Sequence, residues 1–141
     1  MTHLTRRYKF TASHRLHSDR FSAAENLTLY GKCNNPHGHG HDYVLEVCVS
    51  GPLDRVSGQV VNVAALDRLV AAHVVQDFDH KSLNADVGEF QRLVPTSENI
   101  LRVIEQRLAD YWQSAFPGGW PRLKTIRLRE TRRNLFELRA S

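Results

Sequence analysis

Two stretches in the first part of the chain alternate between apolar and polar side chains with the period of a β-strand. In residues 5–16 the even positions from Tyr8 to His14 are apolar or aromatic, whereas the odd positions between them are basic or hydroxylic. From His39 to Val49 the odd positions carry histidine, tyrosine or aliphatic side chains. Because successive side chains of a strand point to opposite faces, each stretch predicts a strand with one apolar face.

The middle and the second half of the chain carry the period of amphipathic helices. From about Ala64 to Gln76, the side chains of one face recur from Leu66 at the i, i+3, i+4, i+7 and i+8 spacing. A second helix is predicted to begin at Thr96 or Ser97, either of which can cap its first turn, and to run to about Ser114. A segment rich in proline and glycine follows and ends it.

Two further strands are predicted at residues 123–131 and 135–139, joined by a tight turn. Residues 17–32 show no clean period and are predicted to be a long connection, which in a compact domain tends to be functional. The resulting order, ββααββ, predicts an α+β domain in which two helices cover one face of a four-stranded antiparallel sheet. The open edges of such a sheet need cover or a partner.

Composition narrows the class of protein. A chain of 141 residues with 41% hydrophobic and 24% charged residues fits a single globular domain over residues 1–141. No apolar run approaches the roughly 18 residues of a membrane span, and the first residues lack the apolar core of a signal peptide. The net charge of +4 is modest and forms no continuous basic stripe. The two cysteines suit a reducing compartment, so we expect a cytoplasmic protein. From the missing apolar run and the modest charge, we expect neither a membrane nor a nucleic-acid partner.

Three histidines form a candidate metal site. His39 and His41 would lie on one face of their strand beside a glycine-rich loop, and His14 lies on the apolar face of the first strand. If the two strands pair, the three imidazoles converge. Neutral imidazole suits zinc, copper, iron or nickel, and three protein ligands leave a position open, as in catalytic zinc sites.

Other residues add chemistry that a metal ion alone does not supply. Cys33 lies beside Lys32 and close to the histidines, and cationic neighbours lower the pKa of a thiol into the reactive range. In the adjacent pair Asp79 and His80, the carboxylate can orient the imidazole and tune it as an acid or base. Glu130 places a carboxylate at the end of an otherwise apolar strand face.

Several separated motifs resemble one known family. The strings TASHRLHS, GKCNNPHGHGHDY, DHKSLN, PTSEN and RETRRN are similar, in order, to those of the 6-pyruvoyl-tetrahydropterin synthase and 6-carboxytetrahydropterin synthase family. The resemblance runs from about Phe10 to the C-terminus. It implies the tunnelling fold, in which subunits join their sheets into a barrel and two trimers stack as a homohexamer with active sites between subunits.

The resemblance also implies roles for the catalytic residues. It implies a Zn²⁺ ion with three ligands, His14, His39 and His41. Cys33 matches the thiol that abstracts a proton, and Asp79 and His80 match the pair that supports a second proton transfer.

The implied substrate is 7,8-dihydroneopterin triphosphate, from which triphosphate is eliminated without an external redox cofactor. Glu130 matches the carboxylate that anchors the pterin ring, and Thr96 matches part of the pterin pocket. Basic side chains, which the sequence does not single out, would hold the triphosphate. His37 could be a spectator, a group behind the ligands or a substrate contact.

Alternatives to this assignment remain open at the level of the sequence. The approach AENLTLYGKCNNP favours the pyruvoyl product, of tetrahydrobiopterin type, over the carboxy reaction, which releases acetaldehyde and serves deazaguanine or queuosine synthesis. A cupin-like protein would also place two histidines on a strand, but the two predicted helices argue against it. A non-enzymatic metal-binding protein would need the histidines but not Asp79, His80 or Glu130.

Overall fold

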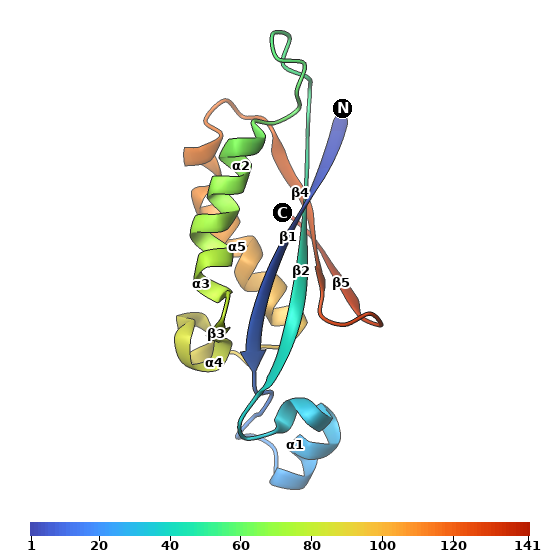
Figure 1. The fold of residues 1–141 in the computed structure, drawn as a ribbon, viewed down its shortest axis with the longest axis vertical. Coiled ribbons are helices and arrows are strands. Elements are labelled where there is room, and N and C mark those ends of the chain that lie inside the picture. Colours follow the sequence, from blue (N-terminus) through green and yellow to red (C-terminus); the bar gives the residue numbers. More distant parts are fainter.

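The computed structural model describes residues 1–141, which form one sheet flanked by helices (Figure 1). The strands and α-helices are β1 (Thr2–His14), α1 (Ala23–Tyr30), β2 (His39–Gly51), α2 (Val63–Val70), α3 (Gln76–Phe78), β3 (Lys81–Ser82), α4 (Leu83–Asp86), α5 (Ser97–Ala115), β4 (Arg122–Arg129) and β5 (Leu135–Arg139). Three shorter helical turns are η1 (Gly31–Asn34) and η3 (Gly88–Gln91), both 3₁₀, and η2 (Ala71–Val75), a π-helical turn.

The sheet has five strands in the order β3-β1-β2-β4-β5. β1 and β2 pair antiparallel over their whole length, and β2, β4 and β5 continue the antiparallel pattern. The prediction of a four-stranded antiparallel sheet is therefore wrong in one respect, because β3 adds a parallel strand beside Ala12 and Ser13. Two residues are too few to show a strand period in the sequence.

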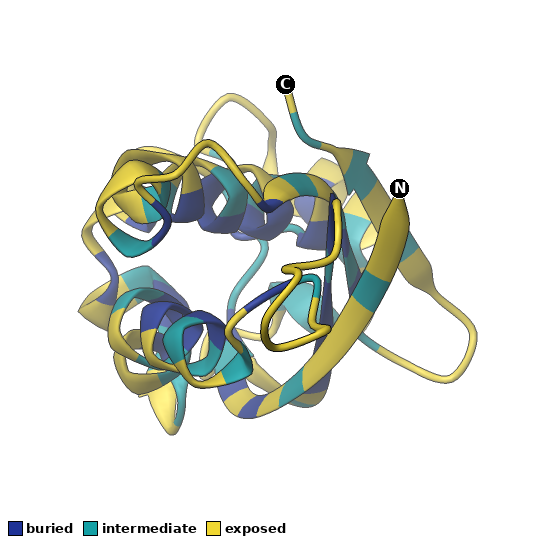
Figure 2. Ribbon diagram, turned by 90° about the horizontal axis from the view of Figure 1, so that it is seen from above, coloured by how far each residue is buried: buried dark blue, intermediate teal, exposed yellow.

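The helices α2, α3 and α5 cover one face of the sheet, as predicted for the two main helices (Figure 1). Buried residues line the inner sides of the helices and the sheet, and the outer surfaces are exposed (Figure 2). The sheet contributes alternate positions to this core, including Phe10, Tyr43, Leu45, Ile126 and Leu128. The predicted apolar faces of the two long strands are thus confirmed.

The predicted helix at residues 64–76 extends over Val63–Phe78 and contains the π-helical turn. Asn62 caps its start by accepting a hydrogen bond from the Ala65 amide at 3.1 Å. The α5 helix begins after Thr96, whose hydroxyl accepts from the Asn99 amide at 3.2 Å, as the cap prediction required. No helix of the structure is both long and apolar enough to span a membrane.

The long connection predicted over residues 17–32 is wrong, because part of it forms α1. Ser22 and Glu25 make a reciprocal capping box, with Ser22 Oγ accepting from the Glu25 amide at 3.1 Å and Glu25 Oε1 accepting from the Ser22 amide at 2.9 Å. Leu27 and Leu29 are exposed, so α1 does not bury an apolar face. Its sequence therefore lacks the helical period of apolar residues by which the other helices were predicted. The last strands, predicted at 123–131 and 135–139, lie at 122–129 and 135–139.

Candidate active site

Strand pairing brings the histidines together at the end of the sheet next to α1 (Figure 1). In the register of β1 and β2, His14 is opposite His39 and Ala12 is opposite His41. The Nε2 atoms of His14 and His41 lie 3.1 Å apart. The rings of His39 and His41 are neighbours on β2, with centroids 4.7 Å apart.

Cys33 joins this cluster because the turn that carries it is tied to the chain leaving β1. The Leu16 amide donates to the Cys33 carbonyl oxygen at 2.7 Å, and the Asn34 side-chain amide donates to the Leu16 carbonyl oxygen at 2.8 Å. As a result, Cys33 Sγ lies 4.0 Å from His41 Nε2. One ligand atom from each of His14, Cys33 and His41 lies within 4.8 Å of the others.

The glycine-rich loop lets the backbone pass close to His14. Gly38 has a φ of +83°, in the left-handed region that glycine adopts without steric cost. A Cβ atom at Gly38 would lie 3.3 Å from the carbonyl oxygen of His14, so a larger residue would press on the strand end. His37, just before it, is exposed and its ring makes no hydrogen bond.

His14 is held in one orientation by its surroundings. Its side chain is buried, at 1% exposure, and its Nδ1 lies 2.8 Å from the carbonyl oxygen of Pro95, with the Tyr43 hydroxyl oxygen at 3.4 Å. A carbonyl oxygen can only accept, so Nδ1 carries the proton and Nε2 presents its lone pair to the cluster. Burial lowers the pKa of His14, which keeps the ring neutral, the form that binds metal ions.

The electrostatics of the neighbouring groups follow from the same burial. Desolvation lowers the pKa of His41, and this effect outweighs the negative charge of Glu130, which raises it. Burial raises the pKa of Cys33, and the charge of Glu130 adds to this. The expectation that neighbouring cations lower the thiol pKa is therefore wrong for the protein groups alone, because the imidazoles beside Cys33 are held neutral.

The donor set fits a divalent transition metal ion. Two neutral imidazole nitrogens and a thiol sulfur, gathered within 4.8 Å, are the ligands of zinc and related ions. The sequence-predicted set of His14, His39 and His41 overlaps this group in two members. His39 is exposed and lies against His41, outside the group in the conformation observed.

Glu130 and Ser97 form a polar pair behind the cluster. Ser97, the first residue of α5, is buried and donates through Oγ to Glu130 Oε2 at 2.6 Å. The negative charge of Glu130 raises the pKa of both Cys33 and His41, so this carboxylate lies near the cluster. Thr96 is engaged as the cap of α5. From the sequence, Ser97 was named only as a possible helix cap and was given no role at the site.

The Asp79 and His80 pair lies on the other side of β1. Asp79 Oδ1 accepts from the Thr11 amide at 2.8 Å, and the His80 amide donates to the Thr11 carbonyl oxygen at 2.6 Å. The two side chains approach each other, with His80 Nε2 3.6 Å from Asp79 Oδ2. No hydrogen bond or ion pair joins this pair to Cys33 within the chain.

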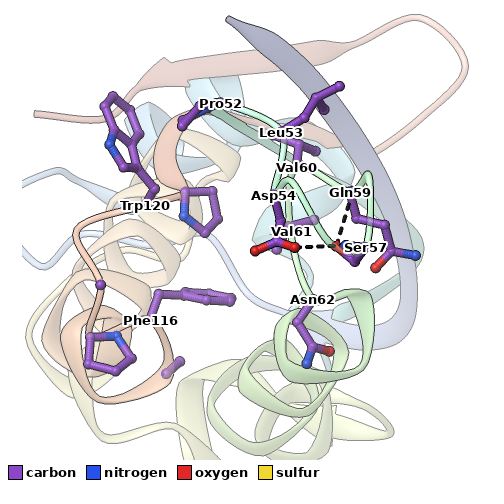
Figure 3. A pocket seen from close by; sticks show the side chains of 14 residues that line it. Pro52, Leu53, Asp54, Ser57, Gln59, Val60, Val61, Asn62, Phe116 and Trp120 are labelled. Carbon is purple, nitrogen blue, oxygen red and sulfur yellow. Dashed lines mark hydrogen bonds between the residues drawn. The ribbon is translucent and has the colours of Figure 1, made fainter.

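A large open cavity lies at the far end of the molecule. It has a volume of about 640 Å³ and is formed by the connection from β2 to α2 and the turn after α5 (Figure 3). Trp120, Phe116 and Pro52 line one side, and Asp54 and Asn62 lie on the other (Figure 3). The histidines lie at the start of β2 and this cavity lies beyond its end, so the 13-residue strand places them about 40 Å apart.

Comparisons with known proteins identify the family of the chain. A family model for 6-pyruvoyl tetrahydropterin synthase matches residues 3–141. The 6-pyruvoyl tetrahydrobiopterin synthase of Drosophila melanogaster is 48% identical over 97 residues, which cover 69% of this chain and 58% of the fly protein. The human 6-pyruvoyl tetrahydrobiopterin synthase is 42% identical over 132 residues, covering 94% of this chain and 87% of the human protein.

A solved structure extends the likeness to three dimensions. The 6-pyruvoyl tetrahydropterin synthase of Caenorhabditis elegans superimposes with a TM-score of 0.87 and 37% identity, covering 99% of this chain and 96% of the worm chain. The resemblance seen in the separated sequence motifs is thereby confirmed over nearly the whole chain. By its sequence, its fold and the histidine cluster, the chain belongs to the 6-pyruvoyl tetrahydropterin synthase family.

Proposed function

We propose that this chain is a zinc-dependent lyase that converts 7,8-dihydroneopterin triphosphate to 6-pyruvoyl-tetrahydropterin with loss of triphosphate. The observation that carries the proposal is the gathering of His14, Cys33 and His41 within 4.8 Å, in a chain of this family. Relatives named 6-pyruvoyl tetrahydrobiopterin synthase, at 42% to 48% identity, favour this product over the carboxy reaction of queuosine synthesis.

The metal ligands in this proposal are His14, His39 and His41. His14 and His41 already direct their Nε2 atoms at one another, 3.1 Å apart. His39 is exposed and beside His41, so its ring is free to turn toward the same point. A zinc ion held there would act as a Lewis acid on the substrate's side-chain hydroxyls and make the neighbouring protons more acidic.

Cys33 is the proposed base for the first proton transfer. Its Sγ lies at the edge of the cluster, 4.0 Å from His41 Nε2, where it can reach a substrate bound beside the histidines. Protein groups alone raise the thiol pKa, and the positive charge of a metal ion works in the opposite direction. In its thiolate form Cys33 can accept a proton from carbon, and the thiol so formed can later return it.

Glu130 is the proposed anchor of the pterin ring. A carboxylate accepts two hydrogen bonds at once, which suits the adjacent amino and ring N–H donors of a pterin. Ser97 donates to one oxygen of Glu130 at 2.6 Å and thereby holds the carboxylate toward the cluster. Thr96 would contribute through the backbone beside its cap, since its hydroxyl already serves the helix.

The Asp79 and His80 pair is proposed to support the second proton transfer. In a multimer, the pair could contribute to an active site formed between two subunits. Within one chain the pair lies along the outer edge of β1, away from Cys33. In a hexamer of two stacked trimers with active sites between subunits, the pair of one subunit would serve a site to which a neighbour contributes. We expect this assembly to act in the cytoplasm, where its free cysteines stay reduced.

A turnover assay tests the proposal. Zinc-loaded protein should release triphosphate from 7,8-dihydroneopterin triphosphate with no added redox cofactor. The Cys33→Ala variant should bind zinc and lose turnover, whereas the exposed His37→Ala variant serves as a matched control. Full turnover by Cys33→Ala would contradict the mechanism, and binding of zinc without any turnover by the unaltered chain would favour a non-enzymatic metal-binding protein.

A further inference from the structure

Arg107 on α5 makes a network of contacts that the proposed chemistry does not use. Its Nε and Nη2 atoms both donate to the Glu89 carboxylate at 2.8 Å. Its Nη1 donates to the His73 carbonyl oxygen at 3.0 Å and to the Asp77 carboxylate. The guanidinium carbon also lies 5.1 Å from the ring centroid of Phe78. One side chain, only 19% exposed, therefore ties α5 to two other segments, the helix over residues 63–78 and η3.

These contacts converge on the residues that lead into the catalytic pair. Asp77 and Phe78 immediately precede Asp79 and His80 in the chain. The His73 carbonyl belongs to the π-helical turn, an irregularity that frequently occurs near functional sites. Arg107 thus binds the helix end just before the pair from the side of α5.

The pair is held from its other side by β1. The Thr11 carbonyl oxygen accepts a hydrogen bond from the His80 amide at 2.6 Å, and the Thr11 amide donates one to Asp79 Oδ1 at 2.8 Å. His80 has a φ of 59°, a left-handed conformation that residues other than glycine keep only when their surroundings fix it. Contacts on one side alone would leave this short segment free to relax.

We propose that Arg107 is a positioning residue for Asp79 and His80, acting through Asp77 and Phe78. The proposal rests on the catalytic role proposed above for that pair. The planar guanidinium fork serves this purpose because it satisfies Glu89, Asp77 and the His73 carbonyl at once. A single ammonium group has no such fork, so lysine cannot reproduce the arrangement.

The Arg107→Met variant tests the proposal, because methionine keeps an apolar stem beside Phe78 and removes every donor. Hydrogen exchange of the Thr11 and His80 amides reports directly on how firmly the pair is held. We expect both amides to exchange about tenfold faster, the effect of losing a charge-assisted hydrogen bond. We also expect kcat to fall about tenfold while KM changes by less than about twofold, because the role proposed for the pair is proton transfer and not substrate binding.

Arg6→Met is the matched control, because Arg6 makes a similar two-pronged ion pair with Asp67, at 3.0 and 2.9 Å, elsewhere on β1. In this variant the exchange rates of the Thr11 and His80 amides, and kcat, should equal those of the unaltered protein. Equal changes in the two arginine variants would overturn the proposal, since they would reflect general destabilisation. Unchanged exchange rates of these two amides in Arg107→Met would overturn it as well.

A second variant covers the case in which Arg107→Met does not fold. Asp77→Asn keeps the Glu89 pair and weakens only the link next to Asp79. It should speed exchange at Thr11 and His80, and normal protection there would overturn the proposal. The amide measurement needs no substrate, so a lack of synthase activity in the unaltered chain would count against the proposed function and not against this role.

Discussion

The Nδ1 atom of His14 lies 2.8 Å from the carbonyl oxygen of Pro95, and this contact decides which nitrogen of the ring can bind a metal ion. The carbonyl oxygen accepts a hydrogen bond from the protonated Nδ1, so the unprotonated Nε2 faces His41 Nε2 at 3.1 Å. Pro95 itself is fixed at the entrance to α5, one residue before the cap. The metal ligand on β1 is thus oriented by the helix that covers the sheet.

The first prediction concerns this ligand. His14→Ala should reduce zinc affinity by about a hundredfold or more, because it removes a preformed ligand and opens a buried site. Competition with a coloured chelator would measure the change. His37→Ala, which alters an exposed histidine of the same loop, should keep the affinity of the unaltered protein. Equal losses in the two variants would contradict the assignment.

The second prediction separates His39 from Cys33 as the third ligand. Cobalt(II) in place of zinc gives a near-ultraviolet charge-transfer band when a thiolate is bound to it. Because burial and Glu130 raise the Cys33 pKa and the thiol is proposed as a base, we expect no such band. Cobalt affinity should fall in His39→Ala and stay nearly constant in Cys33→Ser. A strong band that vanishes in Cys33→Ser would make the thiol a ligand.

The third prediction concerns the pterin anchor. Glu130→Gln keeps the shape of the side chain but removes one acceptor and the charge, so KM should rise about tenfold or more. Ser97→Ala should raise KM less, because the serine only orients the carboxylate, at 2.6 Å. Steady-state kinetics with 7,8-dihydroneopterin triphosphate would measure both. A Glu130→Gln enzyme with an unchanged KM would exclude this anchor.

The fourth prediction follows from the lowered pKa of Glu89. The hydrogen bond from Arg107 holds the Glu89 pKa below its ordinary value of 4.5 in the folded state. The unfolded state then binds more protons near this pH, so the ion pair stabilises the fold above pH 4.5. This stabilisation is lost as the pH falls through the folded-state pKa.

Urea unfolding at several pH values checks this sign. The stability difference between the unaltered protein and Glu89→Gln should be largest at neutral pH and shrink as the pH falls below 4.5. The hydrogen bond from Arg6 lowers the pKa of Asp67 in both proteins alike, so the contribution of Asp67 cancels from the difference. A difference that stays constant from pH 7 to pH 3 would contradict the pKa shift.

The sequence indicated that the three histidines would converge if their strands paired, and the structure shows that pairing. A strand has a period of two residues, so the parity of His14, His39 and His41 determined that they would share the core-facing side. The two long helices could also be predicted, because their apolar residues recur with the helical period and Thr96 is a typical cap residue.

Other parts of the site depend on contacts that no local pattern encodes. Cys33 reaches the histidines through hydrogen bonds with Leu16 and Asn34, across a connection whose only helix is short and largely exposed. The two-residue strand β3 exists because β1 offers an open edge. The raised pKa of Cys33 could not be predicted, since sequence neighbours such as Lys32 do not reveal burial.

The most direct test of the account is the mass of the product formed from 7,8-dihydroneopterin triphosphate by the zinc-loaded protein, with acetaldehyde assayed in the same reaction. We predict a pterin with the mass of 6-pyruvoyl-tetrahydropterin, free triphosphate and no acetaldehyde. A carboxylated pterin together with acetaldehyde would contradict the proposed function and assign the chain to the carboxy reaction.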